Sequence, residues 1–326
     1  MEAVTSSAYN VTEYVVQKTN GRIPMGALVV GLTSAAGSLL ANLLTITAII
    51  SSRLNKHSTH ILVANQSGCD ILVAVNTIAT YTRVIYSHLL PFWLSNILRL
   101  GNSVTIHTVI VISLGNSLLI GVDRFIATVR PFKYKSMVTK KRIYCTIGLM
   151  WFVVISILML PLTIHNRNRN LNTWAINLGD LSKIYPSGFP AFVGFLMISL
   201  IATNSILYFA ILVAFQQVSG RVESSNETGK KSRKLTSTVA IVVIFTLAFY
   251  CPYIVFLIMP PTVGNPSFTQ YVLPHLAIVL ITVGSYMNNI IYPLRQPDYR
   301  KAYLAVLGCK MSLSQIGPAS NLSTGQ

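Results

Sequence analysis

The sequence predicts an all-α membrane protein, a bundle of seven transmembrane helices with a short amphipathic eighth helix. Only 10% of its 326 residues are charged, and the mean hydropathy of +0.58 is higher than a water-soluble domain shows. Apolar stretches long enough to cross the roughly 30 Å bilayer core recur along the chain. The net charge of +17 does not indicate nucleic-acid binding, because the cations lie in short segments between these stretches, where they orient a membrane protein.

Seven apolar stretches are expected to span the membrane, since each is long enough to do so as an α-helix. They comprise residues 25–50, 61–86, 98–125, 143–164, 190–215, 235–259 and 272–294. The sixth contains Pro252, and a proline kinks a helix by removing one backbone hydrogen bond. The stretches divide the chain into an extracellular segment 1–23, a helix domain 24–295, and a cytoplasmic amphipathic helix and tail 296–326.

Polar segments separate the stretches and set their orientation. The first stretch follows a polar segment without the apolar core of a cleavable signal peptide, so it is expected to act as its own insertion signal. Most of the 25 lysines and arginines lie in the loops after the first, third and fifth stretches and in the tail. The positive-inside rule therefore places the amino terminus outside the cell and the end of the third stretch inside it.

Two modification sites follow from this orientation. Asn10 begins an Asn-Val-Thr triplet on the outer side, which is an acceptor for glycosylation. Cys309 closely follows the amphipathic segment 296–307 beside the membrane, a position suited to palmitoylation, with an unmodified thiol as the alternative. The sequence has four cysteines and none in a predicted outer loop, so no extracellular disulfide is expected.

Charged residues within or beside the apolar stretches are the first functional candidates, because a charge at bilayer depth is costly unless it is paired or used. Asp70 lies in the second stretch. Asp123 and Arg124 stand side by side at the end of the third. Taken alone, this pair is either a stop charge at the membrane edge or a functional ion pair.

The order and spacing of the polar residues over roughly 25–309 resemble the rhodopsin-like (class A) G-protein-coupled receptors. The matching positions are Asn42, Asp70, Asp123-Arg124, Pro131, Trp151, Pro252 and the segment 288–292. In that last segment Asn289 replaces the proline of the family's N-P-x-x-Y motif. Arg99 stands where a cysteine usually anchors a disulfide, and the fifth stretch lacks its usual proline. In both absences the sequence resembles the branch of the family that holds melanocortin, cannabinoid and lysophospholipid receptors.

The resemblance implies a conformational switch at the inner end of the bundle. Its residues would be Asp123, Arg124, Tyr208, Tyr250, Pro252, Asn288 and Tyr292. Asp123 would hold Arg124 at rest, and activation would release Arg124 toward Tyr208 and Tyr292. The segment 231–234 has no acid that could help to hold the arginine, so a loosely held switch with raised basal signalling is expected.

The resemblance also implies an ion site in the middle of the bundle. Asp70, Ser113, Asn288 and Asn42 would supply oxygen ligands to a sodium ion, since hard cations prefer oxygen. The alternative is a hydrogen-bond network without an ion. No other cofactor and no metal site are expected from the sequence.

The sequence narrows the class of ligand. Ile106 stands where amine receptors carry an acid, and Thr282 stands where an opsin carries its retinal lysine, so monoamines and retinal are disfavoured. The outer segments carry more cations than acids, which favours an anionic lipid or an acidic peptide; snorkelling of these cations to the membrane surface is the alternative. The candidate ligand-binding residues are Arg83, Arg99, Asn102, Ile106, His107 and Tyr250.

Together these features predict a plasma-membrane receptor that transmits an extracellular ligand signal to a heterotrimeric G protein. The resemblance implies that Arg124, Pro131 and Phe132 contact the G protein, while membrane lipids surround the helices. The sequence shows no catalytic triad, metal cluster or phosphate-binding glycine loop, so an enzyme is not expected. The alternatives are a transporter that uses Asp70, which the lack of an internal repeat disfavours, and a non-signalling receptor-like protein.

Overall fold

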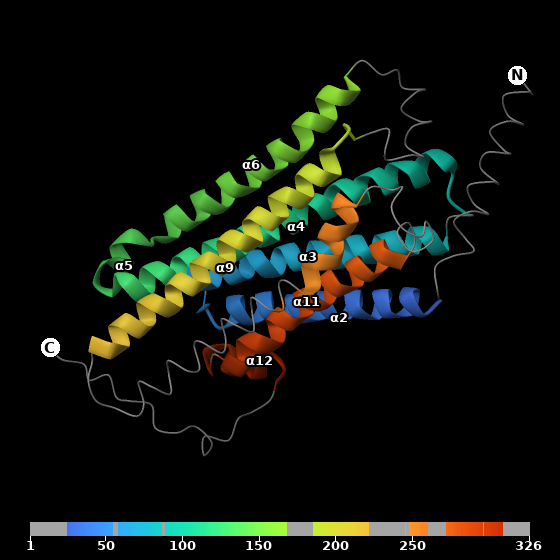
Figure 1. Cartoon of the computed structure of the whole chain (residues 1–326). Coiled ribbons are helices and arrows are strands. Elements are labelled where there is room, and N and C mark those ends of the chain that lie inside the picture. The colour runs from blue at the N-terminus through green and yellow to red at the C-terminus, as the bar shows by residue number, and fades with distance from the viewer. Residues whose placement is uncertain are drawn as a thin grey trace, which may run out of the picture.

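The computed structural model describes residues 25–54, 58–86, 89–167, 185–221, 245, 248–259, 272–295 and 297–308. The described segments are almost entirely α-helical. The helices are α2 (Met25–Ser51), α3 (Ser58–Ile85), α4 (Phe92–Val129), α5 (Pro131–Met137), α6 (Lys140–Asn166), α9 (Phe189–Arg221), a shorter helix Ala248–Ile258, α11 (Leu273–Arg295) and α12 (Pro297–Val306). The long helices run lengthwise through an elongated bundle, as Figure 1 shows.

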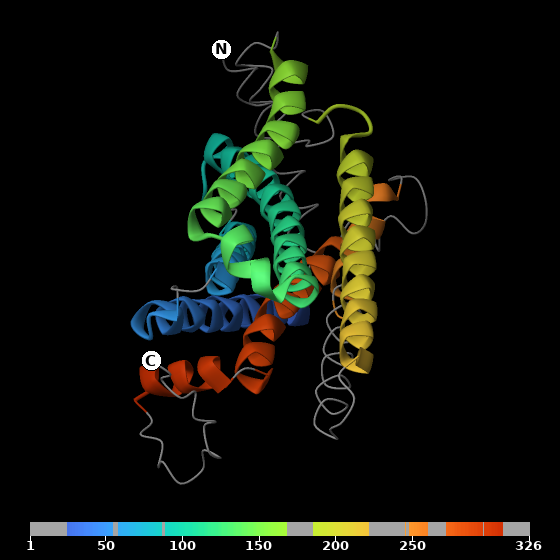
Figure 2. The same ribbon diagram turned by 90° about the vertical axis from the view of Figure 1, so that its left-hand side faces the viewer.

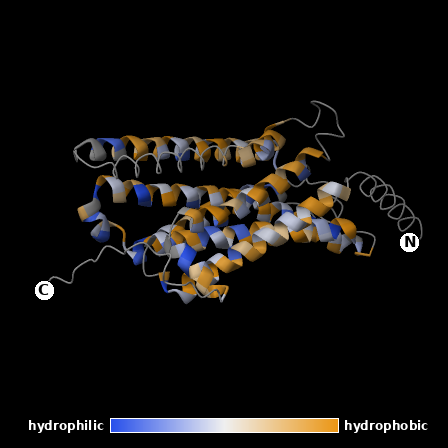
Figure 3. Ribbon diagram, turned by 90° about the horizontal axis from the view of Figure 1, so that it is seen from below, coloured by the Kyte–Doolittle hydropathy of each residue, from blue (hydrophilic) through white to orange (hydrophobic). Residues whose placement is uncertain are grey.

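Six of the helices are long and apolar enough to cross a membrane: α2, α3, α4, α6, α9 and α11. The shorter apolar helix Ala248–Ile258 lies in the sixth predicted stretch, most of whose first half is outside the described residues. Large apolar side chains are exposed along the bundle, as on Phe152 of α6 and Phe209 of α9. Figure 3 shows that hydrophobic residues recur along the long helices. Such surfaces are stable in lipid and not in water.

The helix α4 is the centre of the bundle and contacts α3, α6 and α9. Buried apolar side chains from six helices form one core around it, with Ile110, Leu158, Met197 and Ile281 among those buried completely or nearly so. The end of the bundle that holds α5 and α12 is the one predicted to lie inside the cell, and we call it the inner end. The core occupies the opposite half, which we call the outer half.

The structure corrects two predictions at the inner end. The third stretch was predicted to end at residue 125, but α4 continues to Val129, about one and a half turns beyond Asp123. The pair Asp123-Arg124 therefore lies inside a helix, because apolar residues such as Ile126 extend it. The following segment was predicted as a loop but forms α5, which begins at Pro131, where proline's missing N–H costs nothing.

The amphipathic segment predicted at 296–307 forms α12, which packs across the inner end against α2 and α11 (Figure 2). Its buried side chains Tyr299, Ala302 and Tyr303 join Ala48 and Ile49 of α2 in a second, smaller apolar cluster. This contact fixes α12 to the bundle in addition to any membrane surface it lies on.

Candidate functional site

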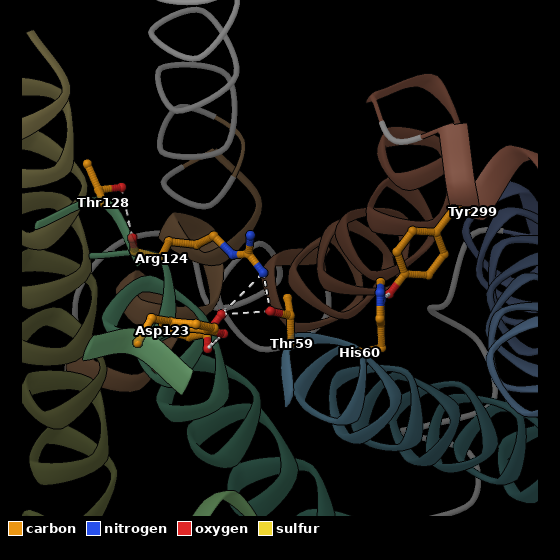
Figure 4. Close-up of polar contacts among 7 residues, drawn as sticks. Thr59, His60, Asp123, Arg124, Thr128 and Tyr299 are labelled. Atoms are coloured by element: carbon orange, nitrogen blue, oxygen red, sulfur yellow. Dashed lines mark hydrogen bonds and ion pairs between the residues drawn. The ribbon is translucent and has the colours of Figure 1, made fainter. Parts of the chain in front are cut away.

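The carboxylate of Asp123 is buried at the inner end and has three partners. The guanidinium Nη2 of Arg124 lies 3.2 Å from Oδ2, and the Thr59 hydroxyl donates to the same oxygen at 2.8 Å. The Tyr134 hydroxyl donates to Oδ1 at 2.6 Å. Figure 4 shows Thr59, Asp123 and Arg124 converging on one point. A buried carboxylate requires this degree of pairing, because desolvation of an unpaired charge is costly.

Three separate elements supply this cluster, which we call the inner lock: Asp123 and Arg124 on α4, Thr59 in the first turn of α3, and Tyr134 on α5. Thr59 links the two charges, since it also accepts a hydrogen bond from Arg124. The sequence prediction that Asp123 is the main restraint on Arg124 was therefore incomplete. Neither Thr59 nor Tyr134 was predicted, because nothing in the sequence brings the start of α3 or the segment after Pro131 to Asp123.

Tyr134 lies outside the membrane-spanning helices. Partial burial, and next its hydrogen bond to Asp123, raise the pKa of its phenol above the ordinary value. The hydroxyl therefore stays protonated and donates to Asp123 at any physiological pH. In contrast, the Arg124 side chain is 47% exposed, so one side of the guanidinium is open to solvent or to a partner.

Tyr208, predicted as a later partner of Arg124, lies on α9 and interacts with Ser117 of α4. It is also close enough to Arg124 for the charge to act on it. The helices approach closely here: a Cβ atom at Gly121 would lie 2.7 Å from Leu207 Cδ2. A small residue lets helices pack tightly in a membrane, so α4 and α9 meet beside the inner lock.

The segment 288–292 lies in α11, but the side chains of Asn288 and Tyr292 are outside the described residues. Asn289 is buried and stands where the family has proline. Its side-chain Oδ1 accepts a hydrogen bond from the Thr45 hydroxyl of α2, and its side-chain Nδ2 donates to the backbone carbonyl of Ser285 at 3.2 Å. Thr45 also bonds the Tyr303 hydroxyl of α12. The asparagine side chain thus joins α11 to α2, a link that a proline could not make, and Thr45 extends this link to α12.

A second tyrosine ties α12 to the bundle. The Tyr299 hydroxyl lies 2.7 Å from Nδ1 of His60 on α3, and the two rings meet edge to face with centroids 5.1 Å apart. Figure 4 shows this pair beside the inner lock, one residue along α3 from Thr59. Burial raises the pKa of Tyr299, so its hydroxyl also stays protonated.

Asp70 is buried in the middle of the bundle within a chain of polar side chains. Gln66 donates from Nε2 to Asp70 at 3.3 Å and to Ser113 at 2.6 Å. Asn116 donates from Nδ2 to the side-chain Oε1 of Gln66 at 3.0 Å. The chain continues to Asn65, which donates to Asn116 at 2.9 Å and accepts from the indole N–H of Trp151 at 3.2 Å.

Of the four predicted sodium ligands, the structure describes the side chains of Asp70, Ser113 and Asn42 but not that of Asn288. Asp70 Oδ2 and Asn42 Oδ1 are buried oxygens without a hydrogen-bond partner among the described residues. Ser113 and Asp70 are joined through Gln66, which the sequence prediction did not include. Asn42 donates to the Ser38 carbonyl at 2.9 Å, on its own helix. Tyr250, predicted both as a switch and as a ligand contact, interacts with Ser113. It begins the turn that leads to Pro252 within the helix Ala248–Ile258.

The predicted ligand residues fall into separate groups. Arg83 at the end of α3 and Arg99 on α4 are close enough for their charges to interact. His107 bonds the Ser103 carbonyl at 2.5 Å, and its ring lies 6.0 Å from those of Tyr185 and Tyr253. Ile106 belongs to the apolar core. Only Arg83, Arg99 and Asn102 lie near the outer ends of their helices.

Nitrogen donors near Arg99 lack partners among the described residues. They are Arg83 Nε, Asn96 Nδ2 and Asn102 Nδ2, all buried. Asn96, Arg99 and Asn102 follow one another at intervals of three residues, which places them along one side of α4. We call these four residues the outer donor cluster. A buried donor without an acceptor costs about 1–3 kcal/mol, so the cluster favours a ligand that brings acceptors.

At the inner surface, the Phe132 side chain is fully exposed on α5, directly after Pro131. Arg130 and Lys133, on either side of this pair, are exposed as well. The predicted modification sites Asn10 and Cys309 lie outside the described residues, as does the basic segment 231–234.

Comparison with known proteins places this arrangement in a family. The sequence model described as 7 transmembrane receptor (rhodopsin family) matches residues 41–293. An allatostatin-A receptor of Bombyx mori is 23% identical, over 83% of this chain and 76% of its own. A sphingosine 1-phosphate receptor 3 of Takifugu rubripes is 24% identical, over 82% of this chain and 67% of its own. A cannabinoid receptor 2 of Mus musculus is 24% identical, over 94% of this chain and 87% of its own.

The match covers the predicted spans from Asn42 onward and includes the sixth stretch, of which the structure describes only part. It confirms the predicted seven-helix membrane fold, the class of signalling receptor and the expectation that the chain is not an enzyme. The relatives come from peptide and lipid receptors alike, so they leave the ligand open. The chain belongs to the rhodopsin family of seven-transmembrane, G-protein-coupled receptors.

Proposed function

We propose that this receptor lies in the plasma membrane with its amino terminus outside and activates a heterotrimeric G protein when an anionic extracellular ligand binds. The observation that carries the proposal is the inner lock, in which a buried carboxylate holds a half-exposed arginine beside a fully exposed phenylalanine. The cations that set the orientation gather on the same side.

Phe132 is the proposed apolar contact for the G protein. Its side chain is fully exposed at the inner end, where an aromatic residue suits the buried anchor of a partner contact. Arg130 and Lys133 beside it also suit acidic lipid head groups, which would hold the surface against the membrane.

The test is nucleotide exchange on purified G proteins by the full-length receptor in lipid nanodiscs. Phe132→Ala is expected to lower the rate of exchange about tenfold, since truncating a buried aromatic anchor costs more than about 1 kcal/mol. Phe152→Ala is the matched control, because Phe152 is exposed on α6 and faces lipid. Equal loss in both variants, or no exchange by the unaltered receptor with any G-protein class, would reject the proposal.

The proposed ligand class rests on the outer donor cluster. Two guanidinium groups close together repel each other, and an anion between them removes the repulsion. Guanidinium forks suit carboxylates and phosphates, and the two asparagines add further donors. One relative is named for sphingosine 1-phosphate, a lipid with a phosphate head group, which agrees with this chemistry. An anionic lipid is therefore the first candidate and an acidic peptide the second.

A non-signalling receptor-like protein is the second candidate function, because Asn289 and Tyr250 replace residues that usually carry the switch. Against it, Asn289 is bonded to Thr45, and Tyr250 interacts with Ser113. Both replacements thus have contacts with neighbouring helices, which supports a working switch with altered parts.

A further inference from the structure

A single hydroxyl group on α2 connects the inner ends of three helices. Thr45 is fully buried, and its Oγ1 donates a hydrogen bond to the side-chain Oδ1 of Asn289 on α11. The same Oγ1 is bonded to the hydroxyl of Tyr303 on α12. Asn289 and Tyr303 are buried as well, so water does not compete freely for these bonds. The helices α2, α11 and α12 are thus linked through one oxygen atom.

The hydrogen-bonding capacity of these groups fixes the direction of the link. The Asn289 side chain donates from Nδ2 to the backbone carbonyl of Ser285 at 3.2 Å, so its Oδ1 faces Thr45 and needs a donor. The Thr45 hydroxyl also lies 3.0 Å from the backbone carbonyl of Ala41, but that carbonyl already accepts an N–H within the helix. Because a hydroxyl has one proton, Thr45 donates it to Asn289 and accepts a hydrogen bond from Tyr303.

The link holds the turn of α11 that leads to Tyr292, the residue expected to approach Arg124 on activation. Asn289 and Tyr292 are three residues apart, so the position of one sets the position of the other. The helix α11 packs against α2, whereas Arg124 belongs to α4, and α3 lies between α2 and α4 (Figure 1). A movement of this turn toward Arg124 therefore draws Asn289 away from Thr45.

We propose that Thr45 is a positioning residue for signalling, whose hydroxyl holds the inner end of α11 against α2 and α12 in the resting receptor. This role rests on the proposed function, since it concerns the step that brings α11 to Arg124. The link exists because Asn289 replaces the family's proline, which has neither a side-chain oxygen nor an amide. The resting state is thus held at two places, by the inner lock at Asp123 and by Thr45.

The test measures basal nucleotide exchange on a G protein and hydrogen–deuterium exchange, both with the purified full-length receptor. Thr45→Val keeps the shape of the side chain but removes the hydroxyl. It is expected to raise nucleotide exchange, and deuterium uptake in residues 285–295, about fivefold each, because the resting state loses one hydrogen bond. Thr45→Ser retains the hydroxyl and should restore both rates. Thr47→Val is the matched control, since Thr47 is exposed on the same helix and donates to the Leu43 carbonyl of that helix.

Asn289→Leu removes the other end of the link and serves as a second variant with the same expected rise. The double variant with Thr45→Val should add little to the larger single effect, because both changes break one link. A residue with a merely structural role would lower stability without raising nucleotide exchange.

The outcomes separate this role from the proposed function. Nucleotide exchange that does not rise in Thr45→Val and Asn289→Leu, while the unaltered receptor is active, would overturn the role of Thr45 alone. Unchanged deuterium uptake in residues 285–295, or an equal rise in Thr47→Val, would overturn it as well. No nucleotide exchange by any variant, including Asp123→Asn, would instead reject the proposed function and this role with it.

Discussion

At the scale of single residues, Tyr134 decides how firmly Arg124 is held. From the sequence alone, Asp123 is the main predicted partner of Arg124, and this weak restraint predicts raised basal signalling. In the structure Tyr134 and Thr59 both donate to Asp123, and Thr59 also bonds Arg124. The carboxylate is thus fixed from α3 and α5. Under the proposed function, we expect basal signalling to depend on these two hydroxyls as well as on the missing acid at 231–234.

Tyr134→Phe is expected to raise basal nucleotide exchange about fivefold, because the loss of a hydrogen bond of about 1 kcal/mol changes an equilibrium by that factor. The pKa of Tyr134 is raised, so the bond is fully present at physiological pH and is lost only as the pH rises through that raised value. The effect should therefore be the same across the physiological range. Tyr144→Phe, an exposed tyrosine of α6, is the control, and an equal effect there would contradict the account.

The residues of the site differ in how well they could be predicted from the sequence. Asp70, Asp123 and Arg124 stand out because charge is rare in apolar stretches. Gln66, Thr59 and Tyr134 do not, since uncharged polar side chains are common at such positions. Their roles depend on contacts between segments far apart in the chain, as between Gln66 and Ser113. A single residue can be matched to a family position from the sequence, but the residue that it contacts in the folded chain cannot be predicted in that way.

At the scale of elements, hydropathy predicts the membrane-spanning helices well and their ends poorly. A helix needs about 20 apolar residues to cross the bilayer core, and hydropathy detects these residues. The ends of the helix depend instead on capping residues and on packing outside the bilayer. Thr139 caps α6 by accepting from the Arg142 backbone N–H, a local signal that the sequence does carry. The helix α5 is basic and short, so hydropathy gave no sign of it.

The helix α12 is held by two tyrosine hydroxyls, Tyr303 at Thr45 and Tyr299 at His60. Tyr303→Phe is expected to speed hydrogen–deuterium exchange in residues 297–306 about fivefold, since it removes a link to α2 worth about 1 kcal/mol. Tyr286→Phe, an exposed tyrosine of α11, is the matched control. Unchanged exchange in Tyr303→Phe would show that the hydrogen bond between Tyr303 and Thr45 does not help to hold α12.

At the scale of the whole molecule, α4 connects the two ends of the receptor. Arg99 of the outer donor cluster and Asp123 of the inner lock lie on this one helix, about 36 Å apart at 1.5 Å per residue. The apolar core and the Asp70 network lie between them. A ligand that binds one state better at the outer end can therefore shift the equilibrium at the inner end.

Screening of anionic lipids and acidic peptides in cells that express the receptor should yield an activator whose potency depends on the outer donor cluster. Arg83→Ala and Arg99→Ala are each expected to lower its potency about tenfold or more, since a charge-assisted hydrogen bond to an anion is worth about 1.5–3 kcal/mol. Arg167→Ala removes an exposed cation at the end of α6 and should have no effect. Equal potency in all three variants at matched surface expression would refute this ligand site.

The most direct test of the central claim is nucleotide exchange on a purified G protein by receptors altered at Asp123 and Arg124. If the inner lock is the switch, Asp123→Asn should raise exchange above the unaltered receptor, because it removes the charge that holds Arg124. Arg124→Ala should reduce exchange to the rate without receptor. Exchange that is the same in both variants as in the unaltered receptor would contradict the account.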